Sequence, residues 1–86
     1  MPRVCEFFGI VIYFYFNDHS PPHFHARYQG AEAAFEIESL AVIAGRLPPR
    51  ATALVVEWAL QRQPELRRAW AQAQSDGSVD SIAPLE

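Results

Sequence analysis

The sequence predicts an α+β protein, in which a three- to four-stranded antiparallel β-meander is followed by two α-helices packed on one face of the sheet. β-Branched and aromatic residues, many of them alternating with polar ones, fill the first half of the chain. After Pro48 and Pro49 the apolar residues recur with a helical period instead. The 86 residues suit one domain, residues 1–86, without a linker or an internal repeat.

Four segments of the first half are predicted as strands. Residues 10–16 are β-branched and aromatic throughout, which favours a central strand. Residues 23–28 and 31–37 alternate polar and apolar side chains, and the Gln29-Gly30 pair between them suits a two-residue hairpin turn. A shorter strand is expected over residues 41–44, ending at Gly45.

The second half predicts two helices separated at Pro64. The first helix begins behind Pro48 and Pro49 and stops near Gln63, because proline is costly inside a helix. The second helix begins at Pro64 and ends at Asp76-Gly77, and residues 82–85 are expected to add a short edge strand. The predicted buried stripes are Ala51, Leu54, Val55 and Trp58 in the first helix and Leu66, Ala69, Trp70 and Ala73 in the second, with the two tryptophans between the helices.

The two-residue turn sets the pairing of the strands on either side of it. Tyr28 then pairs with Ala31, and pairing outward places His23 opposite Glu36. A slip of one residue would bury charged side chains, so the register is firmly specified. One outer face then gathers His23, His25, Arg27, Glu32 and Glu36, with Tyr13 and Tyr15 beside the histidines, while Ile10, Ile12, Phe14 and Phe16 point toward the core.

Composition excludes several classes of protein. A net charge of −3 disfavours nucleic acid as a direct partner and attraction to anionic membranes. The longest apolar run, residues 7–16, is too short to span a bilayer. Cys5 has no second cysteine to pair with and is expected to be a small buried hydrophobe. We therefore expect a cytoplasmic protein that makes no contact with a membrane.

The three histidines lie within seven residues and form a candidate metal site. His23 and His25 are two apart on a predicted strand, so both imidazoles project from one face and could supply two ligands to a divalent transition metal. Glu36 opposite His23, or Asp18 and His19 in the preceding loop, would complete the ligand set. Nothing in the sequence requires a cofactor, so the metal stays one alternative.

The same face also suits acid–base chemistry or a purely structural role. His23 or His25 would act as the acid or base, Arg27 would bind an anion, and Tyr13 or Tyr15 would donate a hydrogen bond, as in a small nuclease or hydrolase. The acidic net charge and the neighbouring glutamates weigh against such an enzyme. In the structural alternative, the histidines hydrogen-bond to the tyrosines and to the glutamate opposite, and order the loop.

Motifs along the whole chain resemble those of a known family. The string D-H-S-P-P-H-F-H-A at residues 18–26 is long and unusual enough to be specific. The chain resembles the small prokaryotic proteins called domain of unknown function 4160, over essentially its whole length. The other shared motifs are Met1-Pro2, Phe8-Gly9-Ile10, Gly45-x-Leu47-Pro48, Val56-Glu57-Trp58, Glu65-Leu66 and Ile82-x-Pro84-Leu85, in that order.

The resemblance implies a protein that works through a partner. Members of the family are short cytoplasmic proteins, often encoded beside a second small protein, and such pairs are commonly listed as candidate toxin–antitoxin or regulatory modules. We therefore expect one component of a two-gene module, with the neighbouring gene product as its partner and a homodimer through the helices as a further assembly. Members often have histidine where this chain has Arg62 and asparagine where it has Ala69. These departures leave the histidine face as the remaining place for catalysis.

Overall fold

A five-stranded antiparallel sheet is followed by two helices, which confirms the α+β class but adds a strand to the predicted meander. The structure is a computed structural model and describes residues 2–75 and 77–86. The strands lie across the sheet in their order along the chain. The elements are β1 (Arg3–Phe7), β2 (Ile10–Tyr13), β3 (His23–Tyr28), β4 (Ala31–Glu36), β5 (Val42–Gly45), α1 (Pro49–Leu60) and α2 (Gln63–Ser75).

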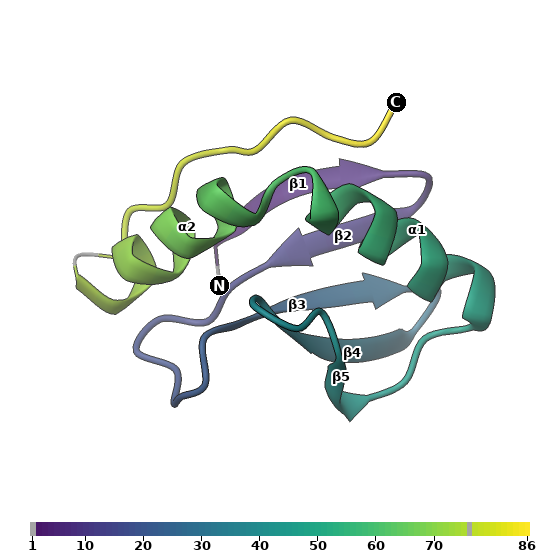
Figure 1. The fold of residues 1–86 in the computed structure, drawn as a ribbon, viewed down its shortest axis with the longest axis horizontal. Coiled ribbons are helices and arrows are strands. Elements are labelled where there is room, and N and C mark those ends of the chain that lie inside the picture. The colour runs from purple at the N-terminus through teal and green to yellow at the C-terminus, as the bar shows by residue number, and fades with distance from the viewer. Residues whose placement is uncertain (1, 76) are drawn as a thin grey trace.

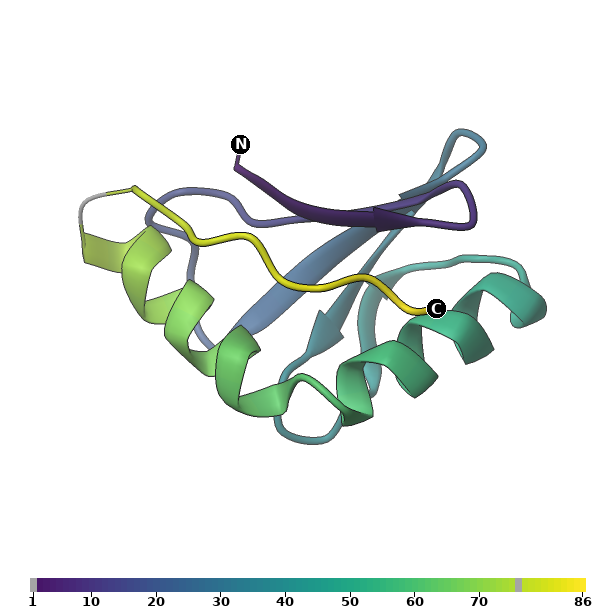
Figure 2. The ribbon, with the colours of Figure 1, turned by 90° about the horizontal axis from the view of Figure 1, so that it is seen from above.

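The molecule has two layers, and both helices lie on one face of the sheet, as predicted (Figures 1 and 2). The segment after α2 runs back between β1 and α1. Its Ile82 amide donates to the Val4 carbonyl at 3.0 Å, and its Ala83 carbonyl accepts the Trp58 indole N–H at 2.8 Å. The expected edge strand at residues 82–85 is wrong, because this segment has no strand conformation and is tied to both layers instead.

The first hairpin was not expected from the sequence. β1 joins β2 through the Phe8-Gly9 turn, whose φ values of +51° and +79° match the twist of a two-residue hairpin. β2 lies between β1 and β3, as a central strand does, but it ends at Tyr13 rather than at residue 16. Phe14 remains buried, whereas Phe16 is 48% exposed. The prediction that Phe16 points into the core is therefore wrong, because the chain turns away from the sheet at Asn17 (φ +52°).

The β3–β4 hairpin has the predicted register in every pair, from His23 opposite Glu36 to Tyr28 opposite Ala31. Gln29 and Gly30 both have positive φ, +49° and +82°, as a type I′ turn requires. Since side chains alternate across a strand, the odd-numbered residues of β3 share one face, opposite the core residues Phe24 and Ala26. The hairpin therefore determines which side chains can form the site.

β5 is the last strand of the sheet, at its edge, and its pairing with β4 requires a glycine at its end. The strand is shifted one residue later than predicted. Gly45 has φ +70°, and a Cβ atom at this position would lie 2.2 Å from the Glu32 carbonyl oxygen. That same oxygen accepts the Arg46 amide at 3.1 Å. The backbone of β5 approaches β4 too closely here for any side chain.

The helices begin and end close to the predicted positions. α1 stops before Gln63, because the Gln61 and Arg62 amides bond to carbonyls three residues earlier and close the last turn. α2 begins one residue before Pro64. Its predicted end at Asp76-Gly77 falls partly outside the described residues, since Asp76 is not among them. Neither helix has the length and apolar composition needed to cross a bilayer.

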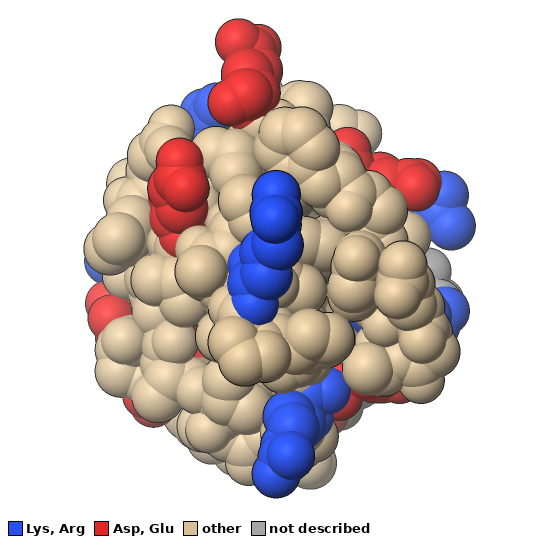
Figure 3. All heavy atoms as spheres, turned by 90° about the vertical axis from the view of Figure 1, so that its right-hand side faces the viewer, with Lys and Arg blue, Asp and Glu red and all other residues tan. Residues whose placement is uncertain are grey.

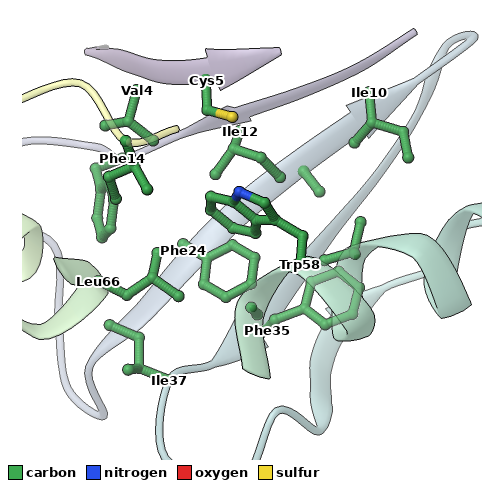
Figure 4. Packing of buried hydrophobic residues seen from close by; sticks show 14 of the residues in the cluster. Val4, Cys5, Ile10, Ile12, Phe14, Phe24, Phe35, Ile37, Trp58 and Leu66 are labelled. Carbon is green, nitrogen blue, oxygen red and sulfur yellow. The ribbon is translucent and has the colours of Figure 1, made fainter. Parts of the chain in front are cut away.

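Trp58 lies at the centre of the core (Figure 4). Its ring centroid is 5.4 Å from that of Phe7 and 5.9 Å from that of Phe24, so one side chain of α1 reaches both β1 and β3. Cys5 is buried in the same cluster, as expected. Trp70 does not lie between the helices, which corrects the prediction, because it is partly buried against the His23 ring at 5.3 Å.

Candidate functional site

The loop between β2 and β3 brings Asp18 over the beginning of β3. α2 holds this loop in place, because the Ala73 carbonyl accepts the Asn17 amide at 3.3 Å and the Gln74 side chain donates to the Asp18 carbonyl at 3.0 Å. The Asp18 side chain is oriented in turn by the His19 amide, which donates to Oδ1 at 2.9 Å. Contacts with a helix far along the chain therefore place a carboxylate beside the histidines.

One oxygen of Asp18 lies against both histidines of β3. Oδ2 is 2.8 Å from Nε2 of His23 and 3.1 Å from Nε2 of His25. The side chains of the three residues are 15%, 3% and 13% exposed, respectively. The two imidazoles project from the same face of β3, as the alternation predicts, and their ring centroids are 5.0 Å apart.

Both ring nitrogens of His23 face hydrogen-bond acceptors. Nδ1 lies 2.7 Å from the Pro21 carbonyl oxygen, and Nε2 faces the Asp18 carboxylate. A neutral imidazole has one N–H, whereas a carbonyl and a carboxylate only accept. A second proton, or another cation, therefore satisfies the contact between His23 and Asp18. His23 is buried rather than on an outer surface as predicted, because Trp70 covers it from α2.

His25 is surrounded by the two predicted tyrosines and a glutamate. Its ring stacks on Tyr13 at 5.3 Å between centroids and meets the ring of Tyr15 edge-on at 4.6 Å. Nδ1 of His25 lies 3.7 Å from Oε2 of Glu32. His25 therefore has a carboxylate near each ring nitrogen, Asp18 on one side and Glu32 on the other.

Tyr13 is held as a neutral hydrogen-bond donor. Its hydroxyl donates to the Glu32 carboxylate. Burial, together with this hydrogen bond, raises the pKa of Tyr13 well above its ordinary value. The Arg27 guanidinium lies 5.0 Å from the centre of the Tyr13 ring. Glu32 was missing from the candidate residues, although the register already placed it on this face opposite Arg27.

Asp18 stays ionised in this setting. Burial acts to raise its pKa, but hydrogen bonds from His25, from the His19 amide and from His23 outweigh that effect and hold the pKa of Asp18 below its usual range. The carboxylate is therefore negatively charged at neutral pH, between two imidazoles.

The remaining candidates lie at the margin. The His19 side chain is 87% exposed, and its Nε2 is 3.8 Å from Oδ1 of Asp18. Glu36 pairs with His23 in register, but its carboxylate accepts the hydroxyl of Ser39 instead. Among the described residues, one group has its metal-ligating atoms within 4.8 Å of one another, and it consists of Asp18, His23 and His25.

A second feature lies at the opposite end of the sheet. An apolar hollow of about 490 Å³ opens where the β1–β2 turn, the end of β3 and the beginning of α1 meet. Phe8 stands beside it with 62% of its surface exposed. Its lining consists of Phe8, Ile10, Tyr28, Pro48, Arg50, Ala51 and Leu54.

The fold and the site define a small α+β protein in which a loop of the β-meander holds a partly buried carboxylate between two histidines. Residues 9–71 match the model of the family described as Domain of unknown function (DUF4160), and the chain belongs to that family. The resemblance inferred from the motifs is thereby confirmed. A search of curated proteins and a search of solved structures each found no match.

Proposed function

We propose that this protein acts by binding a partner protein, as one component of a two-gene module. The observation that supports the proposal is the apolar hollow beside the exposed ring of Phe8. Exposed apolar groups that line a concavity are typical of interaction sites, because burying them removes apolar surface from water. The cytoplasmic location expected from the sequence belongs to the same proposal.

The chemistry of the hollow suggests what kind of segment occupies it. Ile10 and Leu54 offer apolar side chains, whereas Arg50 contributes a guanidinium at the rim. Figure 3 looks onto this end of the molecule, where arginine side chains stand in the middle and at the bottom of the view, with acidic side chains above and beside them. We propose an apolar segment of the partner with an acidic residue beside it, since a guanidinium binds a carboxylate through paired hydrogen bonds.

The family supports a specific source for the partner. Members of the family are often encoded beside a second small protein. The product of the neighbouring gene is therefore the proposed occupant of the hollow. A second copy of this chain, paired through the helices, is the competing occupant. Size-exclusion chromatography with light scattering of the purified chain separates the two, because a homodimer forms without the neighbour.

Co-expression with the neighbouring gene tests the proposal. The tagged wild-type chain is expected to retain the neighbour, whereas Leu54→Glu, which places a charge in the hollow, is expected to release it. Leu60→Glu is the matched control, because Leu60 lies on the same helix, is 62% exposed and does not line the hollow. Circular dichroism checks that both variants fold. Equal retention by the two variants, or no retention by the wild type, would contradict the proposal.

A small histidine-dependent nuclease or hydrolase is the second candidate. The observation that favours it is the position of His25 between the carboxylates of Asp18 and Glu32. The ring of Tyr13 stacks on His25, and its hydroxyl group donates a hydrogen bond to Glu32. Against it stands the net charge of −3, which repels a polyanionic substrate. Growth of cells expressing wild type or His25→Ala separates the two candidates, since toxicity lost with His25 supports the enzyme.

A further inference from the structure

We propose that Asp18, His23 and His25 bind one divalent first-row transition metal ion. The three residues come from a loop and a strand, and their ligand atoms converge within 4.8 Å. Two of the separations, 2.8 and 3.1 Å between Oδ2 of Asp18 and the Nε2 atoms, are short enough for the atoms to share one ion at about 2.0–2.2 Å.

The hydrogen-bonding of His23 argues for a cation at this position. Its Nδ1 lies 2.7 Å from the Pro21 carbonyl oxygen, which only accepts, so this contact favours the tautomer with the proton on Nδ1 and a lone pair on Nε2. Nε2 lies 2.8 Å from Oδ2 of Asp18, so a cation between them, either a second ring proton or a metal ion, satisfies both groups. We assign the metal ion, because Nε2 of His25 converges on the same Oδ2 atom at 3.1 Å, and all three groups then become its ligands.

Groups outside the ligand set support the same arrangement. In metal-binding histidines the second ring nitrogen usually donates a hydrogen bond to a carbonyl or a carboxylate. This bond fixes the orientation of the ring and makes the ligand more basic. His23 has the Pro21 carbonyl in this position at hydrogen-bond distance, whereas the Glu32 carboxylate lies on the corresponding side of His25 at 3.7 Å, too far for a direct hydrogen bond. Both imidazoles therefore present Nε2 toward Asp18.

The donor set determines the class of ion. Two imidazoles and one carboxylate favour Zn²⁺, Fe²⁺, Co²⁺ or Ni²⁺, whereas Mg²⁺ and Ca²⁺ prefer oxygen ligands alone. Three protein ligands leave further coordination positions for water or another small ligand. The site is at the beginning of β3 and the apolar hollow is at its end, so metal binding is independent of the proposed partner contact.

Calorimetric titration of the metal-free chain with Zn²⁺ tests this proposal. The wild type is expected to bind one ion per chain, and Asp18→Asn and His25→Gln are expected to bind at least about tenfold more weakly. His19→Ala is the matched control, because His19 is in the same loop but its side chain is 87% exposed, and it is expected to bind like the wild type.

Co²⁺ provides a second readout that does not depend on stability. Imidazole nitrogens bound to Co²⁺ give visible absorption bands, which are expected for the wild type and for His19→Ala. Circular dichroism of each metal-free variant shows whether it folds. Absence of stoichiometric Zn²⁺ binding and of Co²⁺ bands in the folded wild type would overturn the proposal, as would an equal loss of binding in His19→Ala.

Discussion

The imidazole of His23 and the carboxylate of Asp18 meet at 2.8 Å, and this contact ties the loop after β2 to the first residue of β3. His23 is 3% exposed, and Trp70 of α2 covers it. The contact therefore joins three parts of the chain, namely the loop, the sheet and the second helix. In the metal-free protein this part-buried contact is a charge-assisted hydrogen bond, which contributes to stability.

Removal of the Asp18 carboxylate is expected to destabilise the metal-free protein. Asp18→Ala leaves a buried ring nitrogen of His23 without its partner, which costs about 1–3 kcal/mol of unfolding free energy. Urea denaturation measures this loss. His19→Ala is expected to change the free energy of unfolding by less than about 0.5 kcal/mol, because the side chain is exposed. Similar losses in the two variants would contradict the account of the loop.

Gly45 and Gly30 are expected to respond differently to alanine. Gly45→Ala adds a Cβ atom 2.2 Å from the Glu32 carbonyl oxygen in a residue with φ +70°, so it should cost about 3 kcal/mol of unfolding free energy. Gly30→Ala meets no atom within 4 Å and pays for its positive φ alone, about 1 kcal/mol. Thermal and urea unfolding compare them, and equal losses would show that β5 does not approach β4 this closely.

Cys5 is expected to be unreactive at neutral pH and to weaken the fold at alkaline pH. Burial, opposed in part by the charge of Arg62, raises the pKa of Cys5 from 9.0 to about 11. The folded chain then holds the thiol proton more tightly than the unfolded chain does. Stability is complete below about pH 9 and falls as the pH rises from 9 toward 11, by about 1–2 kcal/mol.

Unfolding in urea at several pH values measures this dependence. The same series on Cys5→Ala is the control, and its stability should fall less between pH 9 and 10, where Cys5 titrates in the unfolded chain. A thiol reagent added to the folded wild type at pH 8 should react slowly. Rapid modification of Cys5 under those conditions would show that the side chain is accessible rather than buried.

The β3–β4 hairpin could be predicted because its information is local. A two-residue turn at Gln29-Gly30 fixes which residues pair, and a period of two fixes which side chains share a face. The positions of His25 and Glu32 on one face follow from these two facts, and the alternation within β2 adds Tyr13 to the same face. β1 could not be recognised in the same way, because its buried residues do not alternate along the strand.

The sequence offered Asp18 beside the histidines only as an alternative to Glu36, because the position of Asp18 depends on contacts distant in sequence. The loop is fixed by Ala73 and Gln74 of α2, more than fifty residues later. The same helix brings Trp70 over His23, so a residue expected on the surface is buried. Glu36 lies opposite His23 in the strand register, which made it a candidate metal ligand. In the folded protein the loop places the carboxylate of Asp18 beside His23 instead.

Chemical-shift mapping tests the proposed mode of action most directly. The ¹⁵N-labelled chain is titrated with the unlabelled product of the neighbouring gene, and the amide signals are followed. We predict that the shifts concentrate around the apolar hollow, at Phe8, Tyr28 and Leu54, and that His25 and its neighbours change little. Shifts concentrated on the histidine face, or no shifts at saturating partner, would contradict partner binding through the hollow.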